Sequence, residues 1–250
     1  VKVNDELYLS TGQKVRVKAI HAQNTSSEQG IAGQRLALNL NVDLDRMPMK
    51  RGDWLLQNEP LPPTDRISVQ ILAEVPLNEN QPVHIYHGAS RTTGKLTLLQ
   101  GKNAAKNDCT LAEIILDSPL FLAFGDKLIL RSGDTKTLIA GARVLEINSP
   151  KRHKRTEVRL NFLANLALAE NASQRIALTL QHNATTARQL MWTEQLTSSQ
   201  LDKALTERDS VRYQDWCFNN NYVQEKTQQI LTALNTYHEQ HNDQLGVSKA

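Results

Sequence analysis

The chain has 250 residues, of which 40% are hydrophobic and 22% charged. This composition excludes wholesale disorder, and the length suits two or three small domains. Because 29 Lys and Arg stand against 26 Asp and Glu, the net charge of +3 is too small to indicate a nucleic-acid partner by itself. Any such partner must therefore be argued from local clusters of charge.

Several features of the sequence bear on where in the cell the protein is expected. No run of about 18 apolar residues occurs, which excludes a membrane-spanning helix. The first residues lack the apolar core of a signal peptide, so we expect a cytoplasmic protein. They also lack an initiator Met, and we expect the chain to be a fragment. Cys109 and Cys217 lie far apart in sequence and are expected to be reduced thiols.

Glycine and proline divide the chain near Pro150. The first 150 residues hold 10 of the 11 Gly and all 8 Pro, whereas the last 100 residues hold one Gly. Because both residues favour turns and are unfavourable inside helices, we expect strands in the first part and mostly helices in the second. The Pro-rich segment Glu59–Pro63 is expected to separate two barrels within the first part.

Apolar and polar residues alternate along short segments of the first part. The segments expected to form strands are Val15–Ala19, Leu36–Leu40, Ile67–Ile71, Val83–His87 and Lys95–Leu99. Gly88–Gly94 is expected to form a turn-rich connection between the last two. A period of two over many short segments predicts antiparallel barrels or sandwiches.

A tetrapeptide pattern recurs at Asn4–Leu7, Gly52–Leu55 and Gly125–Leu128. Each copy begins with Asn or Gly, continues with Asp and ends in Leu. Asn and Gly tolerate a left-handed backbone, and an Asp side chain can bond the nearby backbone. We therefore expect three tight turns, each leading into a strand.

The second part changes to a helical period. Two apolar stripes are expected, one of Val158, Phe162, Leu163 and Leu166 and one of Leu201, Ala204 and Leu205. Thr197–Gln200 matches a capping box for the second helix. Two short strands, Val211–Tyr213 and Trp216–Phe218, precede a helix near Tyr222–His241 that Asn219 to Asn221 can cap. Helices followed by a small hairpin are typical of a winged helix, and the last helix is expected to begin a second one.

No recognisable catalytic motif occurs in the sequence. Gly88–Lys95 resembles a phosphate-binding loop, but it has five residues between its glycines and lacks the Ser or Thr that would reach magnesium. His84 and His87 are expected to point to opposite faces of a strand. His238 and His241 could share a helix face, yet they lack a third ligand, which favours a solvated helix end. We expect no catalysis, no metal and no cofactor in this chain.

A basic segment follows Pro150. Its cations are Lys151, Arg152, Lys154, Arg155 and Arg159. Four positive charges in five residues can contact several phosphates, and the alternative is a solvated interdomain linker. If four phosphates of an RNA are contacted, the logarithm of the affinity should fall with the logarithm of salt concentration with a slope of roughly −3 to −4.

Arg35 is the second candidate binding residue. It precedes Leu36 at the mouth of a predicted strand, on the face opposite the Leu row. A side chain in this position is available to an anionic ligand, and the alternative is an ordinary surface Arg at an edge.

Several motifs of the chain resemble the bacterial selenocysteine-specific elongation factors, the SelB family. The motifs that resemble the second domain of this family are His21–Asn24, Ala32–Leu38 and Arg51–Leu56. Those that resemble its third domain are Val83–His87, Thr93–Leu99, Leu111–Glu113, Asp117–Leu120 and Leu138–Val144. Leu231–His241 looks like the start of the later winged-helix array of the family.

The resemblance implies a role in translation. Members of the family bind GTP with magnesium, carry selenocysteyl-tRNA to the ribosome at recoded UGA codons, and grip a messenger hairpin with their last winged helices. The Arg that matches Arg35 helps to line the pocket for the charged selenocysteine. An Arg partner suits a selenolate, which is anionic near neutral pH.

The resemblance also implies an architecture of two elongation-factor-Tu-like antiparallel β-barrels, domains II and III, followed by mainly α winged-helix modules. The implied domains are a partial barrel at 1–58, a barrel at 62–150, a winged helix at 151–221 and the truncated start of a second at 222–250. The GTPase domain and the hairpin-binding modules of the family are missing. We therefore expect a tRNA-binding portion without GTP hydrolysis or specific hairpin binding.

Two other functions compete with this interpretation. Winged helices often read duplex DNA with a recognition helix, which would make the chain a DNA-binding regulator. The candidate recognition helix near Ser198–Thr206 carries Lys203 against Asp202, which is poorly basic for the major groove. The mild net charge would also suit a purely structural spacer.

Overall fold

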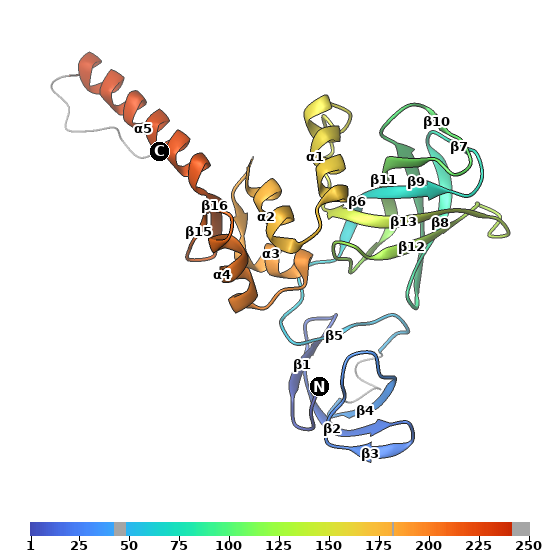
Figure 1. Ribbon diagram of the computed structural model, residues 1–250. Coiled ribbons are helices and arrows are strands. Elements are labelled where there is room, and N and C mark those ends of the chain that lie inside the picture. Colours follow the sequence, from blue (N-terminus) through green and yellow to red (C-terminus); the bar gives the residue numbers. More distant parts are fainter. Residues whose placement is uncertain (43–48, 182, 242–250) are drawn as a thin grey trace. The chain divides into compact units, whose positions relative to one another are not determined.

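A computed structural model describes residues 1–42, 49–181 and 183–241 (Figure 1). The chain forms two compact units, Val1–Lys154 and Arg155–Ala250. The first unit is built from strands and the second mainly from helices, as the distribution of Gly and Pro predicts. In the described residues no helix is long and apolar enough to cross a membrane.

The first unit begins with a five-stranded antiparallel sheet, here called the N-terminal sheet. Its strands are β1 (Glu6–Leu9), β2 (Lys14–Ala22), β3 (Thr25–Ser27), β4 (Leu36–Leu40) and β5 (Leu55–Leu56). They follow the order β3-β2-β1-β5, and β4 also pairs with β2. Val15 and Val17 of β2 are buried, as the alternation predicts. The pairing with β4 shifts register between Val17 and Ala19, so that Ile20 is buried and Ala19 is not.

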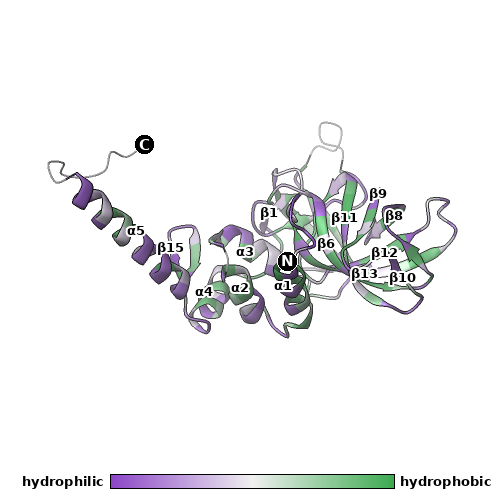
Figure 2. Cartoon of the chain, turned by 90° about the horizontal axis from the view of Figure 1, so that it is seen from above, coloured by the Kyte–Doolittle hydropathy of each residue, from purple (hydrophilic) through white to green (hydrophobic). Residues whose placement is uncertain are grey.

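A closed six-stranded barrel completes the first unit. Its strands, in barrel order, are β11 (Cys109–Leu120), β6 (Thr64–Ala73), β13 (Leu138–Ile147), β12 (Lys127–Arg131), β8 (Gln81–His87) and β9 (Ser90–Leu98). Two short strands, β7 (Leu77–Asn78) and β10 (Asn103–Ala104), form a separate pair. Hydrophobic and hydrophilic residues alternate along the barrel strands (Figure 2). The inward set, which includes Ile67, Ile85, Leu96, Ile114 and Leu130, is fully buried.

The three predicted tight turns are confirmed. Asn4, Gly52 and Gly125 have φ values of 72°, 100° and 84°, in the left-handed region. In each turn the following Asp accepts a hydrogen bond from the backbone N–H three residues before it, at 2.7, 2.6 and 2.9 Å. The turns lead into β1, β5 and β12. Local chemistry therefore fixes where three of the strands begin.

The connection between β8 and β9 is shorter than predicted. His87 pairs with Ser90, so Gly88 and Ala89 form a two-residue hairpin loop and β9 begins where a longer turn was expected. Gly88 has a φ of 53°, which a hairpin turn of this length requires. The segment Gly88–Lys95 is thus a hairpin turn followed by a strand, whereas the phosphate-binding loop of a nucleotide site leads into a helix.

The second unit has the element order of a winged helix, preceded by α1 (Glu157–Leu168). The elements are α2 (Ala172–Leu180), β14 (Thr185–Thr186), α3 (Ala187–Glu194), α4 (Ser198–Thr206), β15 (Ser210–Tyr213) and β16 (Trp216–Asn219). Strand order is β14-β16-β15. The core of the module is formed by Ile176, Leu180, Ala187, Leu190, Leu201, Ala204, Leu205 and Cys217.

Two predicted helix caps are confirmed, and one predicted apolar stripe includes a residue that is not buried. The Thr197 and Gln200 side chains form the capping box of α4, and Asn219 caps α5 (Asn220–Gln240). In α1, however, the buried side contains Leu163 and Leu166, whereas Val158 lies outside it and is exposed. Helices α2 and α3 were not predicted.

Candidate nucleic-acid interface

Arg35 lies on the surface of the N-terminal sheet. It is exposed and lies directly before β4, at the mouth of the strand, as the sequence predicts. Ala22 of β2 pairs with Leu36, so Arg35 stands one residue beyond this pairing, next to the β2–β3 turn. That turn contains Gln23 and Asn24, both with positive φ. Arg35 is thus presented at the rim of the sheet, where a ligand can reach it.

Local hydrogen bonds hold the segment that carries Arg35. The backbone N–H of Ile31 donates to the side chain of Gln34 at 2.9 Å, and the N–H of Gln34 donates to the Ile31 carbonyl at 3.3 Å. Gly30 exchanges hydrogen bonds with Val1 at 2.7 and 3.0 Å. Hydrogen bonds therefore hold the backbone before Arg35, and β4 begins directly after it.

The predicted basic segment is divided between the two units. Lys151, Arg152 and Lys154 end the first unit, and Arg155 opens the second. Lys151 and Arg152 are exposed, as an RNA contact requires. Lys154 differs, because its ammonium donates to the Glu113 carboxylate at 2.7 Å. Its charge is therefore matched within the protein by a buried carboxylate.

Glu113 forms the anchor for the end of this segment. Its side chain is 1% exposed on β11, and its carboxylate also accepts a hydrogen bond from Arg66 of β6 at 2.8 Å. A buried carboxylate needs such partners, because an unpaired charge away from water is costly. The contact between Glu113 and Lys154 therefore ties the last residue of the first unit to the barrel wall.

Arg155 and Arg159 belong to the second unit. Arg155 is exposed and precedes the N-cap of α1, where the Thr156 side chain accepts a hydrogen bond from the Arg159 backbone N–H. The Arg159 guanidinium is half-buried and lies 5.3 Å from the centre of the Phe162 ring. Arg159 thus packs on its own helix, while Arg155 remains the more accessible of the two.

The surface of α4 does not suit the major groove of DNA. The charged residues of this helix are Asp202 and Lys203. Arg212 of the neighbouring strand β15 donates to the Ser198 hydroxyl at 3.1 Å and pairs with Asp202 at 3.5 Å. Because a cation near the recognition helix is bound by a carboxylate of that helix, little positive charge is left there for phosphates.

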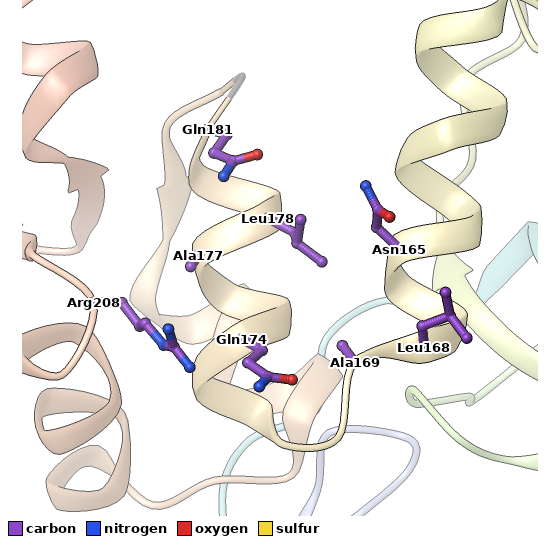
Figure 3. Close-up of a pocket in the computed structure, with 8 residues that line it drawn as sticks. All are labelled: Asn165, Leu168, Ala169, Gln174, Ala177, Leu178, Gln181 and Arg208. Atoms are coloured by element: carbon purple, nitrogen blue, oxygen red, sulfur yellow. The ribbon is translucent and has the colours of Figure 1, made fainter.

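A groove that sequence analysis did not predict lies between α1 and α2 (Figure 3). Its volume is about 350 Å³, and its lining residues are Asn165, Leu168, Ala169, Gln174, Ala177, Leu178, Gln181 and Arg208. Three of these carry amides and one is a cation, whereas the others are apolar. No signal in the sequence could have found it, because its walls come together only through the packing of two helices.

Each described histidine that the sequence analysis considered has its own contacts. His84 contacts the carbonyl of Gly133 at 3.2 Å, and His87 contacts Asp126 at 3.3 Å. Among the residues that the structure describes, no group of three His, Cys, Asp or Glu could hold a metal ion. His238 and His241 both lie against the Tyr237 ring near the end of α5.

Known proteins of one family match the chain. Residues 64–151 match the β-barrel domain of the selenocysteine-specific elongation factor. Over 250 residues the chain is 95% identical to the selenocysteine-specific elongation factor of Haemophilus influenzae (strain ATCC 51907 / DSM 11121 / KW20 / Rd). Its resemblance to the selenocysteine-specific elongation factors is confirmed. The Escherichia coli (strain K12) protein of the same name is 37% identical over 247 residues.

The matches cover the chain more completely than they cover the relatives. They include 100% and 98% of this chain but 40% and 39% of the Haemophilus influenzae and Escherichia coli proteins. The chain therefore spans about two fifths of the length of the curated relatives it matches.

Solved structures of this family share the fold. The crystal structure of bacterial selenocysteine-specific elongation factor EF-Sec superposes with a TM-score of 0.73 and 20% identity, covering 100% of this chain and 39% of that chain. The apo form of translation elongation factor SelB from Methanococcus maripaludis gives a TM-score of 0.51 and 21% identity, covering 60% of this chain and 38% of that chain. These likenesses support the predicted fold class, β-barrels followed by a mainly helical winged-helix part.

Proposed function

We propose that the chain is the tRNA-binding portion of a selenocysteine-specific translation elongation factor. In the whole protein this portion would help to deliver selenocysteyl-tRNA to the ribosome at recoded UGA codons. The observation that carries the proposal is the 95% identity to the Haemophilus influenzae factor over the entire chain. A cytoplasmic location goes with this function.

The roles of the parts follow from the same proposal. Residues 1–58 and 62–150 would hold the acceptor and T-stem side of the tRNA, and residues 151–221 and the start of a second winged helix at 222–250 would extend from them. GTP with magnesium would be bound by a domain outside this chain, and the messenger hairpin by further winged helices. We therefore expect no GTP hydrolysis by these 250 residues, and nucleotide-dependent phosphate release above background would contradict this.

Arg35 is proposed to contact the selenocysteine on the tRNA. Its exposure at the rim of the N-terminal sheet supports this role, because a selenolate can approach it from solvent. Replacing Arg35→Ala should weaken binding of selenocysteyl-tRNA by about 10- to 100-fold, the usual value of a hydrogen bond to a charged group. Binding of the uncharged tRNA should not change.

Lys18→Ala is the matched control for Arg35→Ala. Lys18 is also an exposed cation of the N-terminal sheet, on β2. A general loss of positive charge would weaken both tRNAs equally in both variants, whereas a selenocysteine contact changes one tRNA in one variant. Equal losses for Arg35→Ala with charged and uncharged tRNA would refute the assignment.

Lys151, Arg152 and Arg155 are proposed to contact RNA phosphates. Each is exposed to solvent, where a phosphate can reach it. With three exposed cations, the slope of log affinity against log salt should become shallower by roughly 2 to 3 when all three are replaced by Ala. An unchanged slope would assign the segment to a solvated linker.

A further inference from the structure

Within the first unit, Trp54, directly before β5, brings an aromatic ring of the N-terminal sheet against the barrel. The Trp54 ring centre lies 5.9 Å from the His87 ring and 6.3 Å from the Phe121 ring, with an interplanar angle of 42° in both cases. Beside it, the Ser90 hydroxyl donates to the Gly52 carbonyl at 3.3 Å. Tilted rings at these separations are a favourable aromatic arrangement.

The sheet side of this contact is held in place before it meets the barrel. The Trp54 carbonyl accepts a hydrogen bond from the Ser10 N–H at 2.9 Å, and the Trp54 N–H donates to the Ser10 hydroxyl at 3.3 Å. Asp53 accepts from that hydroxyl at 3.3 Å and from the Lys50 N–H at 2.6 Å. These bonds fix the backbone from which the indole projects.

The barrel side is equally fixed. His87 is the last residue of β8, its side chain is 14% exposed, and its Nε2 lies 3.3 Å from the Asp126 carboxylate. Asp126 itself accepts a hydrogen bond from the Ala123 N–H at 2.9 Å. The Asp126 contact thus orients the imidazole, whose ring lies beside the indole.

We propose that Trp54 is a positioning residue that locks the N-terminal sheet onto the barrel through His87 and Phe121. Glu59–Pro63 is the covalent connection between the two bodies, and a linker alone leaves their orientation open. The lock keeps Arg35 at a set distance from the barrel, so that one tRNA meets both surfaces at once. This last consequence rests on the proposed tRNA function, whereas the lock itself does not.

The experiment measures residual dipolar couplings of backbone amides in the full chain. In the unmodified protein one alignment tensor should fit both the N-terminal sheet and the barrel. In Trp54→Ala the two bodies should need different tensors, and Trp54→Phe, which keeps a ring, should restore the common one. Trp216→Ala is the matched control, because this Trp is 49% exposed on β16 of the other unit.

A second variant tests the lock from the barrel side. His87→Gln keeps a polar group for Asp126 but removes the ring. The N-terminal sheet and the barrel should therefore need different alignment tensors in this variant too. A common tensor in both Trp54→Ala and His87→Gln would overturn the proposal. If Trp54→Ala does not fold, His87→Gln alone decides.

Binding of selenocysteyl-tRNA is the second readout. If the lock is lost and the binding-competent orientation is populated about one tenth of the time, affinity should fall about tenfold in Trp54→Ala. If Trp54→Ala gives different tensors but unchanged tRNA affinity, Trp54 does lock the sheet onto the barrel, but the lock has no role in binding. If the unmodified chain does not bind tRNA, the proposed function fails, and the couplings still judge the lock.

Discussion

The barrel and helix α5 are stabilised in different ways. Every barrel strand pairs on both sides, and its inward side chains are fully buried. Helix α5 has 21 residues, and none of these described residues is buried. Its support is local, from the Asn219 cap and from contacts such as Lys226 over the Tyr222 ring. Because most of the stability of a helix in a protein comes from tertiary packing of its apolar face, the two regions should respond very differently to substitution.

Core truncation should show the largest difference. Leu130→Ala removes a fully buried side chain of β12 and should lower the free energy of unfolding of the barrel by about 2–5 kcal/mol. Ile230→Ala changes a residue that is 59% exposed on α5 and should have an effect within about 0.5 kcal/mol. Denaturant unfolding of the two variants checks this, and equal effects would remove the distinction.

Loss of the buried Glu113 carboxylate should have the second-largest effect on stability. Glu113→Gln leaves Arg66 and Lys154 without their counter-charge, which should cost about 2 kcal/mol of barrel stability. Adding Lys154→Met should recover part of the loss, because the two residues interact directly. Glu28→Gln, at an exposed position of the same unit, is the control. Additive effects of Glu113→Gln and Lys154→Met in thermal unfolding would show that the contact carries little energy.

The capping box gives a smaller effect in the second unit. Thr197→Ala removes the side-chain acceptor for the Gln200 N–H and should lower the stability of the winged helix by about 1 kcal/mol. Thr206→Ala, near the other end of α4, should stay within about 0.5 kcal/mol. Unfolding followed through amide exchange of α4 measures both, and equal values would mean that the cap is not used.

Two carboxylates should titrate in opposite directions. Burial raises the pKa of Glu194 although Arg175 bonds it at 2.8 Å, whereas hydrogen bonds from Lys14 and then Arg16 lower the pKa of Glu6. In a carboxyl NMR titration Glu6 should therefore lose its proton at a lower pH than Glu194. The reverse order would contradict the described environments of both groups.

The same directions decide the pH dependence of stability. Because the folded pKa of Glu194 is above its usual value of 4.5, its contribution is fully present below that value and is lost as pH rises through the raised pKa. The contribution of Glu6 has the opposite sign and is lost as pH falls. Glu194→Gln should remove the first dependence without changing the second.

Local patterns predicted much of this fold. Alternation of apolar and polar residues predicted β2, β4, β6 and β8. Turn chemistry predicted the tight turns at Asn4, Gly52 and Gly125, which lead into three strands. Side-chain caps found the beginnings of α4 and α5. In each case the responsible residues lie within a few positions of one another, so short-range sequence contains the information.

Long-range contacts could not be predicted. Lys154 and Glu113 are 41 residues apart, and only the closed barrel reveals that one candidate RNA contact is already paired. The contact of Trp54 with His87 likewise depends on how the sheet meets the barrel. Helices α2 and α3 were missed because each has only a short buried stripe, which consists of Ser173, Ile176 and Leu180 in α2 and of Ala187 and Leu190 in α3.

The proposed function requires that these 250 residues bind tRNA. Fluorescence anisotropy of labelled selenocysteyl-tRNA, with a duplex DNA of equal charge as competitor, tests it most directly. We expect binding of the tRNA that the DNA does not displace at equal concentration and that falls steeply with salt. Equal weak binding of both polyanions would contradict it, and would assign the chain to a structural spacer.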